Sequence, residues 1–84
     1  DAIVTLGCVI RGETPHFDYV CSAANDGIAA VAREASIPIL FGVLTTDDWE
    51  QALARAGEGS GNKGYEAAVA ALQMVDLYAR LAGN

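Results

Sequence analysis

Basic residues are scarce in this sequence. Its 84 residues include five Lys and Arg against eleven Asp and Glu, which gives a formal net charge of -6 at pH 7. Proteins that bind the phosphate backbone of nucleic acids depend on Lys and Arg clustered along one face. The shortage therefore argues against nucleic acid as a partner, and it makes the positions of the few cations informative.

Cysteine and long apolar segments are also scarce. The two cysteines, Cys8 and Cys21, have neither the spacing of a metal-binding motif nor the density of a disulfide scaffold. We expect them to be buried, reduced thiols in a cytoplasmic protein. No apolar stretch reaches the roughly 18 residues of a membrane-spanning helix, and no secretory signal pattern is present. The sequence therefore predicts no membrane partner.

Hydrophobic residues, by contrast, make up 52% of the chain, which predicts a packed core. Residues 2–10 form an almost unbroken apolar run, typical of a strand buried on both faces of a parallel sheet. Residues 18–35 have a helical period that ends before Pro38, and residues 39–44 form a second apolar run. Two buried strands joined by a helix predict a right-handed βαβ unit.

Two further helices are expected after this unit. Residues 47–56 form the first, with Asp47 and Glu50 spaced as a capping box, and residues 65–82 form the second. Its apolar face is expected at Ala68, Leu72, Val75 and Ala79. A loop with four glycines in eight residues, 57–64, separates the two helices. Two parallel strands cannot cover their own edges, so we expect the chain to be part of a larger domain.

His16, the only histidine, ends the turn of residues 11–16 that follows the first strand. An imidazole with an unperturbed pKa of about 6.5 suits proton transfer near neutrality. A lone histidine is more often structural, but open α/β sheets carry their sites at the carboxyl ends of strands, so both a catalytic and a structural role stay open. Gly12, Glu13 and Thr14 offer N–H groups and a hydroxyl to an anion, or they form a plain connecting turn.

The glycine-rich loop lies between two cations. Arg55 precedes it and Lys63 is near its end, and both can direct positive charge at a phosphate or complement the ends of the helices. The loop lacks the spacing of a P-loop. Phe41, inside the second strand, is core by default, whereas Trp49 on the short helix is expected at an interface.

Four segments carry a resemblance to a known family. They are Gly7-Cys8-Val9-Ile10-Arg11-Gly12-Glu13-Thr14-Pro15-His16-Phe17-Asp18-Tyr19-Val20, then Phe41-Gly42-Val43-Leu44-Thr45-Thr46, then Glu50-Gln51-Ala52 with Arg55-Ala56-Gly57, and Gly61-Asn62-Lys63-Gly64. In order and over nearly the whole chain they closely resemble the 6,7-dimethyl-8-ribityllumazine synthase family. The resemblance implies an α/β fold, a flavodoxin-like three-layer α/β/α sandwich with a parallel sheet. Residues 1–84 correspond to the C-terminal part of one such domain, its later β-α-β-α-α half.

The resemblance also implies a transferase of riboflavin biosynthesis that uses no cofactor and no metal. Members of the family condense 5-amino-6-(D-ribitylamino)uracil with 3,4-dihydroxy-2-butanone 4-phosphate through an imine, with loss of phosphate and water. By this resemblance His16 is the acid/base. The residues implied to bind the substrates are Cys8, Val9, Ile10, Glu13, Thr14, Phe41, Arg55 and Lys63.

These implied roles divide between the two substrates. The turn at Glu13 and Thr14 holds the butanone phosphate, with Arg55 as its charge partner. Phe41 covers the pyrimidine ring, and residues 8–10 lie along the ribityl chain.

The family also implies a homo-oligomer. Members form pentamers, stacked pentamers or closed icosahedral shells, and Phe41 and Arg55 reach the site from a neighbouring subunit. Lys63 matches a nearby cation, and Gly59 stands where many members carry a lysine. The missing strands are expected from an earlier half or a companion chain. The alternatives are a non-catalytic shell or scaffold subunit, a fragment of the same fold, and a phosphate- or flavin-binding module.

Overall fold

Two parallel strands form the centre of the chain. The computed structural model describes residues 1–58 and 61–83. β1 (Ile3–Ile10) and β2 (Ile39–Thr46) pair in register from Ile3 opposite Ile39 to Ile10 opposite Thr46. Both strands therefore end at the same edge, as the sequence predicts, and the loops that follow them leave from that edge.

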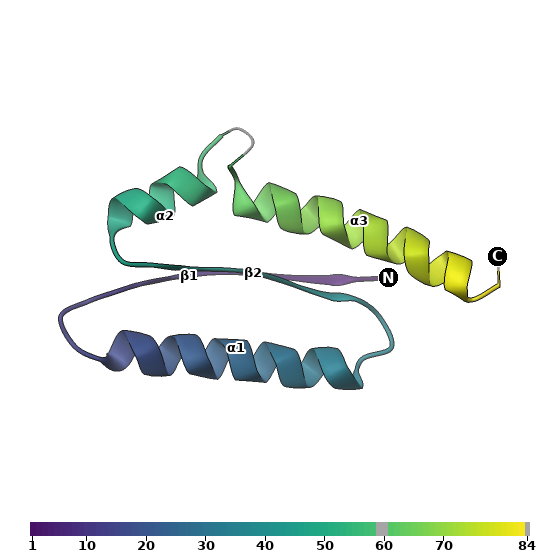
Figure 1. Ribbon diagram of the computed structural model, residues 1–84, viewed down its shortest axis with the longest axis horizontal. Helices are drawn as coiled ribbons and strands as arrows, with labels where there is room; N and C mark the ends of the chain where they lie inside the picture. The colour runs from purple at the N-terminus through teal and green to yellow at the C-terminus, as the bar shows by residue number, and fades with distance from the viewer. Residues whose placement is uncertain (59–60, 84) are drawn as a thin grey trace.

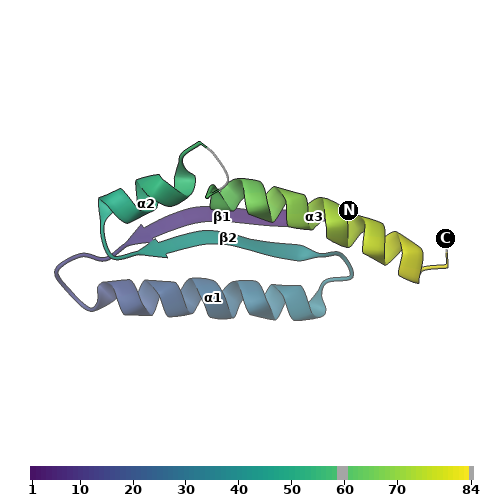
Figure 2. The ribbon, with the colours of Figure 1, turned by 45° about the horizontal axis from the view of Figure 1, so that its top comes forward.

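Three helices cover the two faces of this pair. α1 (His16–Glu34) connects the strands, and α2 (Trp49–Ala56) and α3 (Lys63–Leu81) follow β2. Figures 1 and 2 show α1 on one face of the sheet and α2 and α3 on the other. The result is a flat three-layer body with extents of 51 × 30 × 11 Å. The expected α/β fold and the β-α-β-α-α order are confirmed.

None of the helices in residues 1–58 and 61–83 is long and apolar enough to cross a membrane.

Two of the helices begin earlier than expected. α1 starts at His16 instead of residue 18, because Pro15 holds a φ of -70° that leads directly into the helix. α3 starts at Lys63 instead of residue 65, because the Asn62 side chain caps it. Both His16 and Lys63 are therefore first residues of helices.

The cap of α2 differs from the expected one by a single residue. Asp48, and not Asp47, is the N-cap, and its carboxylate accepts a hydrogen bond from the Gln51 N–H at 2.8 Å. The Gln51 side chain accepts in return from the Asp47 N–H at 2.8 Å. The predicted pairing of Asp47 with Glu50 is therefore wrong. Adjacent aspartates are equally good caps, so spacing alone does not choose between them.

Burial is lower than the sequence predicts. The buried hydrophobic residues among those described are Ala52, Ala67 and Ala71, whereas Leu6 of β1 is 69% exposed and Phe41 of β2 is 47% exposed. The prediction of strands buried on both faces is therefore wrong for the described chain. Each strand pairs only with the other within residues 1–58 and 61–83, so one edge of each is uncovered.

The face of α3 that packs on the sheet also differs from the expected one. Ala67 and Ala71 are buried, whereas Leu72, which was expected on the apolar face, is 74% exposed. The reason is a close approach to Gly42 of β2, since a Cβ built on this glycine lies 3.4 Å from the Ala67 Cβ. Only a row of small side chains fits at this distance.

We predict that Gly42→Ala destabilises the fold. The added Cβ would lie 2.6 Å from the Thr5 carbonyl oxygen, which belongs to the backbone of the paired strand and cannot turn away. Overpacking of this kind costs about 1–3 kcal/mol in free energy of unfolding. Urea unfolding followed by circular dichroism measures this cost.

The matched control is Gly27→Ala in α1, where an added Cβ has no atom within 4 Å. Alanine in a helix interior is more favourable than glycine by about 0.5–1 kcal/mol. Equal stability of the Gly42→Ala variant and the parent would contradict the close approach of the strands at this position.

Candidate functional site

Arg11 is the centre of a cluster at the carboxyl edge of the strands. Its N–H donates to the Thr46 carbonyl at 2.8 Å, and its Nε donates to Asp47 Oδ1 at 2.9 Å. Its Nη1 lies 3.7 Å from Asp18 Oδ1. The guanidinium carbon lies 4.4 Å from the centroid of the Phe17 ring, within the range of a cation–π contact. One side chain thus joins the loop after β1, the turn after β2 and the first turn of α1.

The charges of this cluster favour the ionised form of Arg11. The hydrogen bond to Asp47 raises the pKa of Arg11 above its ordinary value, and the charges of Asp18 and Asp47 act in the same direction. The sequence analysis named Arg11 only as part of a motif and assigned it no individual role. The signal was Asp47 directly after a strand in register with β1, together with Asp18 at the start of the helix that follows.

Three of the candidate residues lie next to this cluster. Glu13 and Thr14 are in the turn between β1 and α1, and His16 is the first residue of α1; all three are exposed. Pro15 is the N-cap and supplies no side-chain hydrogen bond to the first turn. Amide groups at such a helix start are donors that a bound anion can accept from. The turn therefore places an imidazole at a helix start that has no side-chain cap.

A hollow on the opposite face of the sheet brings two other candidates together, Cys8 of β1 and Arg55 of α2. It has a volume of about 280 Å³. Its lining consists of Leu6, Gly7, Cys8, Gly42, Leu44, Arg55, Ala56, Asn62 and Gly64. The Arg55 guanidinium donates to the Gln51 carbonyl at 3.2 Å. Cys8 is exposed and Cys21 is half-buried, so the expectation of buried thiols is wrong; Cys8 faces the hollow instead of a packed helix.

The remaining candidates lie outside these two groups. Phe41 pairs in register with Thr5, and its side chain is 47% exposed instead of forming core. Lys63 begins α3, where its Nζ lies 3.3 Å from Glu66 Oε2. Val9 and Ile10 are half-buried at the end of β1. Within one copy of the chain, the candidate residues thus form two groups, one at the turn before α1 and one at the hollow beside Cys8. Phe41 and Lys63 belong to neither group.

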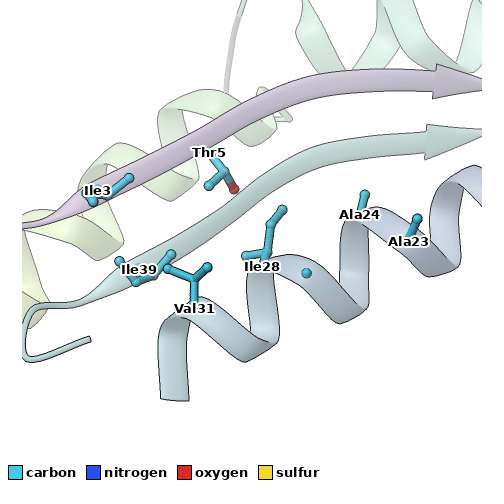
Figure 3. Close-up of a pocket in the computed structure, with 8 residues that line it drawn as sticks. Ile3, Thr5, Ala23, Ala24, Ile28, Val31 and Ile39 are labelled. Carbon is cyan, nitrogen blue, oxygen red and sulfur yellow. The ribbon is translucent and has the colours of Figure 1, made fainter. Parts of the chain in front are cut away.

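A second hollow, between α1 and the sheet, is apolar (Figure 3). It has a volume of about 310 Å³. Its lining consists of Ile3, Thr5, Ala23, Ala24, Gly27, Ile28, Val31 and Ile39. Figure 3 shows Ile28 and Val31 directed from α1 towards the strands. The Thr5 hydroxyl already donates to the Leu40 carbonyl at 2.8 Å. With no titratable lining residue, this hollow belongs to the packing of α1 and has no group for proton transfer.

Asn62 fixes the junction between α2 and α3. Its Nδ2 donates to the carbonyls of Ala56 at 3.0 Å and Gly57 at 2.8 Å, and its Oδ1 accepts from the Tyr65 N–H at 2.7 Å. This amide therefore ties the end of the helix that carries Arg55 to the start of α3. Gly59, which stands at a lysine position of the resembled family, lies outside the described residues.

Comparison with known proteins identifies the family. A sequence model described as 6,7-dimethyl-8-ribityllumazine synthase matches residues 1–79. The chain belongs to the 6,7-dimethyl-8-ribityllumazine synthase family. A curated lumazine synthase from Chlorobaculum tepidum is 59% identical over 81 residues, which cover 96% of this chain and 52% of the relative. The resemblance read from the sequence is thus confirmed, and the chain spans about half the length of this lumazine synthase.

We predict that Asn62→Ala lowers the free energy of unfolding by about 1–2 kcal/mol, because it removes an N-cap and two hydrogen bonds to the end of α2. Asn62→Asp is the matched variant: it keeps the acceptor for the Tyr65 N–H and loses both donors. It should therefore lie between Asn62→Ala and the parent in urea unfolding. Identical stability of all three proteins would show that the amide does not hold this junction.

Proposed function

We propose that this chain carries part of a lumazine synthase active site. In this proposal the intact protein condenses 5-amino-6-(D-ribitylamino)uracil with 3,4-dihydroxy-2-butanone 4-phosphate in riboflavin biosynthesis, as a transferase without a cofactor. The observation that carries the proposal is the family match over residues 1–79, with 59% identity to a relative that is named for this activity. We propose further that residues 1–84 form the C-terminal part of a single domain.

His16 is the acid/base of this proposal. Formation of an imine from the amine and the ketone releases water, and departure of phosphate and ring closure each move further protons. A group that titrates near neutrality can both donate and accept in such a sequence. The exposed position of His16 at the carboxyl edge of the sheet supports this role, because substrate can reach the imidazole there.

The phosphate of the butanone substrate binds at the turn formed by Gly12, Glu13 and Thr14. The first turn of α1 has no side-chain cap, which leaves N–H donors for an anion. Arg55 supplies the opposite charge, which stabilises the leaving phosphate as its negative charge grows. In this proposal Lys63 adds a second positive charge nearby.

The sheet separates His16 from Arg55 within one copy of the chain, since α1 and α2 lie on opposite faces (Figure 1). This separation supports a site completed by the Arg55 and Phe41 of a neighbouring copy. The ring of Phe41 covers the pyrimidine, and residues 8–10 line its ribityl chain. The oligomer is a pentamer or a multiple of pentamers, including closed shells.

Large exposed apolar side chains support both the oligomer and further strands on the sheet edges. Leu6 is 69% exposed, Trp49 65%, Leu53 55% and Leu72 74%. Apolar surface of this extent marks contacts with other protein segments. The missing strands come from the remainder of the domain or from a companion chain. The two free cysteines support a cytoplasmic location.

We predict that His16→Ala lowers kcat by about 10²–10⁴-fold, the usual contribution of a general acid/base. The assay uses the intact protein encoded by the natural gene, with both substrates, and follows formation of the lumazine product. Asn25→Ala, an exposed position on the same helix, is the control and should keep the parent kcat. Light scattering should give the same oligomer for all three proteins. An unchanged kcat in His16→Ala would refute the role of the imidazole.

We predict that Arg55→Ala raises KM for the butanone phosphate by about tenfold or more, because a charge-assisted contact to the phosphate is lost. KM for the pyrimidine substrate should change much less. Arg33→Ala is the matched control, since Arg33 is an exposed arginine in the last turn of α1. Equal increases in both KM values would contradict the phosphate assignment.

Mixed oligomers test whether the site is shared between copies. Subunits with His16→Ala and subunits with Arg55→Ala are each impaired alone. If His16 and Arg55 act across an interface, random mixing in equal amounts restores about one quarter of the sites. A site built within one copy would show no recovery above the average of the two parents.

A further inference from the structure

Arg11 lies where three elements of the chain meet. Its N–H donates to the Thr46 carbonyl at 2.8 Å, one residue beyond the end of β1. This hydrogen bond continues the pairing of the two strands and fixes the backbone of Arg11 to both of them. The backbone position that carries the Arg11 side chain is therefore held by the sheet.

The guanidinium uses different parts of its plane for different partners. Nε donates to Asp47 Oδ1 at 2.9 Å, Nη1 lies 3.7 Å from Asp18 Oδ1, and the group lies over the Phe17 ring at 4.4 Å. A lysine has one charged nitrogen and no planar face, so it cannot make these three contacts together.

Arg11 provides the polar attachment of the first turn of α1. Among residues 1–58 and 61–83, the contacts of Arg11 are the only hydrogen bonds or ion pairs that join residues 12–18 to the strands or to the turn after β2. The N-cap, Pro15, adds no side-chain hydrogen bond. His16 directly precedes Phe17 and Asp18, the two α1 residues that Arg11 contacts. The position of the imidazole therefore follows from where Arg11 holds this turn.

These contacts restrict geometry more than they stabilise the fold. The Arg11 side chain is 46% exposed and that of Asp47 is 66% exposed. Ion pairs in water contribute little to folding stability, because solvent screens them and two side chains lose freedom. A planar group with contacts to the turn after β2 and to the first turn of α1 still limits how far these two segments move relative to each other.

We propose that Arg11 is a positioning residue: held between Asp47, Asp18 and Phe17, it fixes the His16 imidazole and the anion-binding turn relative to the carboxyl edge of the sheet. This inference rests on the proposed function, since it concerns the same site. Arg11 acts through the start of α1 and makes no contact with the substrate. Its loss therefore affects turnover more than binding.

The test compares Arg11→Ala and Arg11→Lys with Arg33→Ala in the intact protein. A misplacement of about 1 Å in a reacting group costs about 10²-fold in rate, so we expect both Arg11 variants to lose tenfold or more in kcat. KM for the pyrimidine and the melting temperature should stay at the parent values, and Arg33→Ala should match the parent throughout. Hydrogen exchange in a peptide covering residues 12–20 should be faster in both Arg11 variants and unchanged in Arg33→Ala.

Two variants of Asp47 separate geometry from charge. Asp47→Asn keeps an oxygen that accepts from Arg11 Nε and loses the negative charge, whereas Asp47→Ala loses both. If Arg11 positions the turn, Asp47→Asn retains most of the parent kcat and Asp47→Ala falls with Arg11→Ala. Equal losses in the two Asp47 variants would overturn the positioning role.

Other results would also overturn it. These are a parent kcat in Arg11→Ala, full rescue by Arg11→Lys, and a rise in KM for the butanone phosphate with kcat unchanged, which would assign Arg11 to direct binding. A parent protein that forms no lumazine product overturns the proposed function together with this inference. An active parent with an equally active Arg11→Ala variant overturns this inference alone.

Discussion

In-register pairing of two parallel strands is the constraint on which this structure depends. β1 and β2 have eight residues each and end opposite one another, at Ile10 and Thr46. Arg11 and Asp47 thereby become neighbours across the edge, although 36 positions separate them in the sequence. A shift of one residue would send alternate side chains to the other face and separate this pair. The register thus decides which side chains point to each face of the sheet and which residues meet at its carboxyl edge.

The same sheet divides the candidate residues between two faces. α1, which begins at His16, lies on one face, and α2, which carries Arg55, lies on the other (Figure 2). Gly42 and Ala67 bring α3 close to the strands, since a Cβ built on Gly42 lies 3.4 Å from the Ala67 Cβ. Under the proposed function, the substrate contacts come from the carboxyl edge and from the hollow beside Cys8. A second copy completes the proposed site, because the helices that carry His16 and Arg55 lie on opposite faces of the sheet.

Element order and strand pairing were predictable from the sequence, because apolar runs, Pro38 and the glycine-rich loop mark the element boundaries clearly. The family was predictable from the resemblance of four motif segments. Details that depend on a choice between adjacent residues of the same type were not predictable. α3 has alanines at successive positions, so periodicity did not distinguish the buried row of Ala67 from the exposed Ala68. Adjacent aspartates concealed the true cap of α2. The low burial of the strands could not be read from composition, because burial depends on what covers them.

The contacts of Arg11 could not be read from the sequence alone, because its partners lie in two other segments, residues 17–18 and 46–47. Asp47 and Asp18 place two carboxylates beside the turn that is proposed to bind phosphate. In a chain with a net charge of -6, such carboxylates repel an anionic substrate. The guanidinium offsets them at short range, and its hydrogen bond to Asp47 keeps it directed at the edge. Positioning and charge compensation thus have one origin, a planar cation anchored where both strands end.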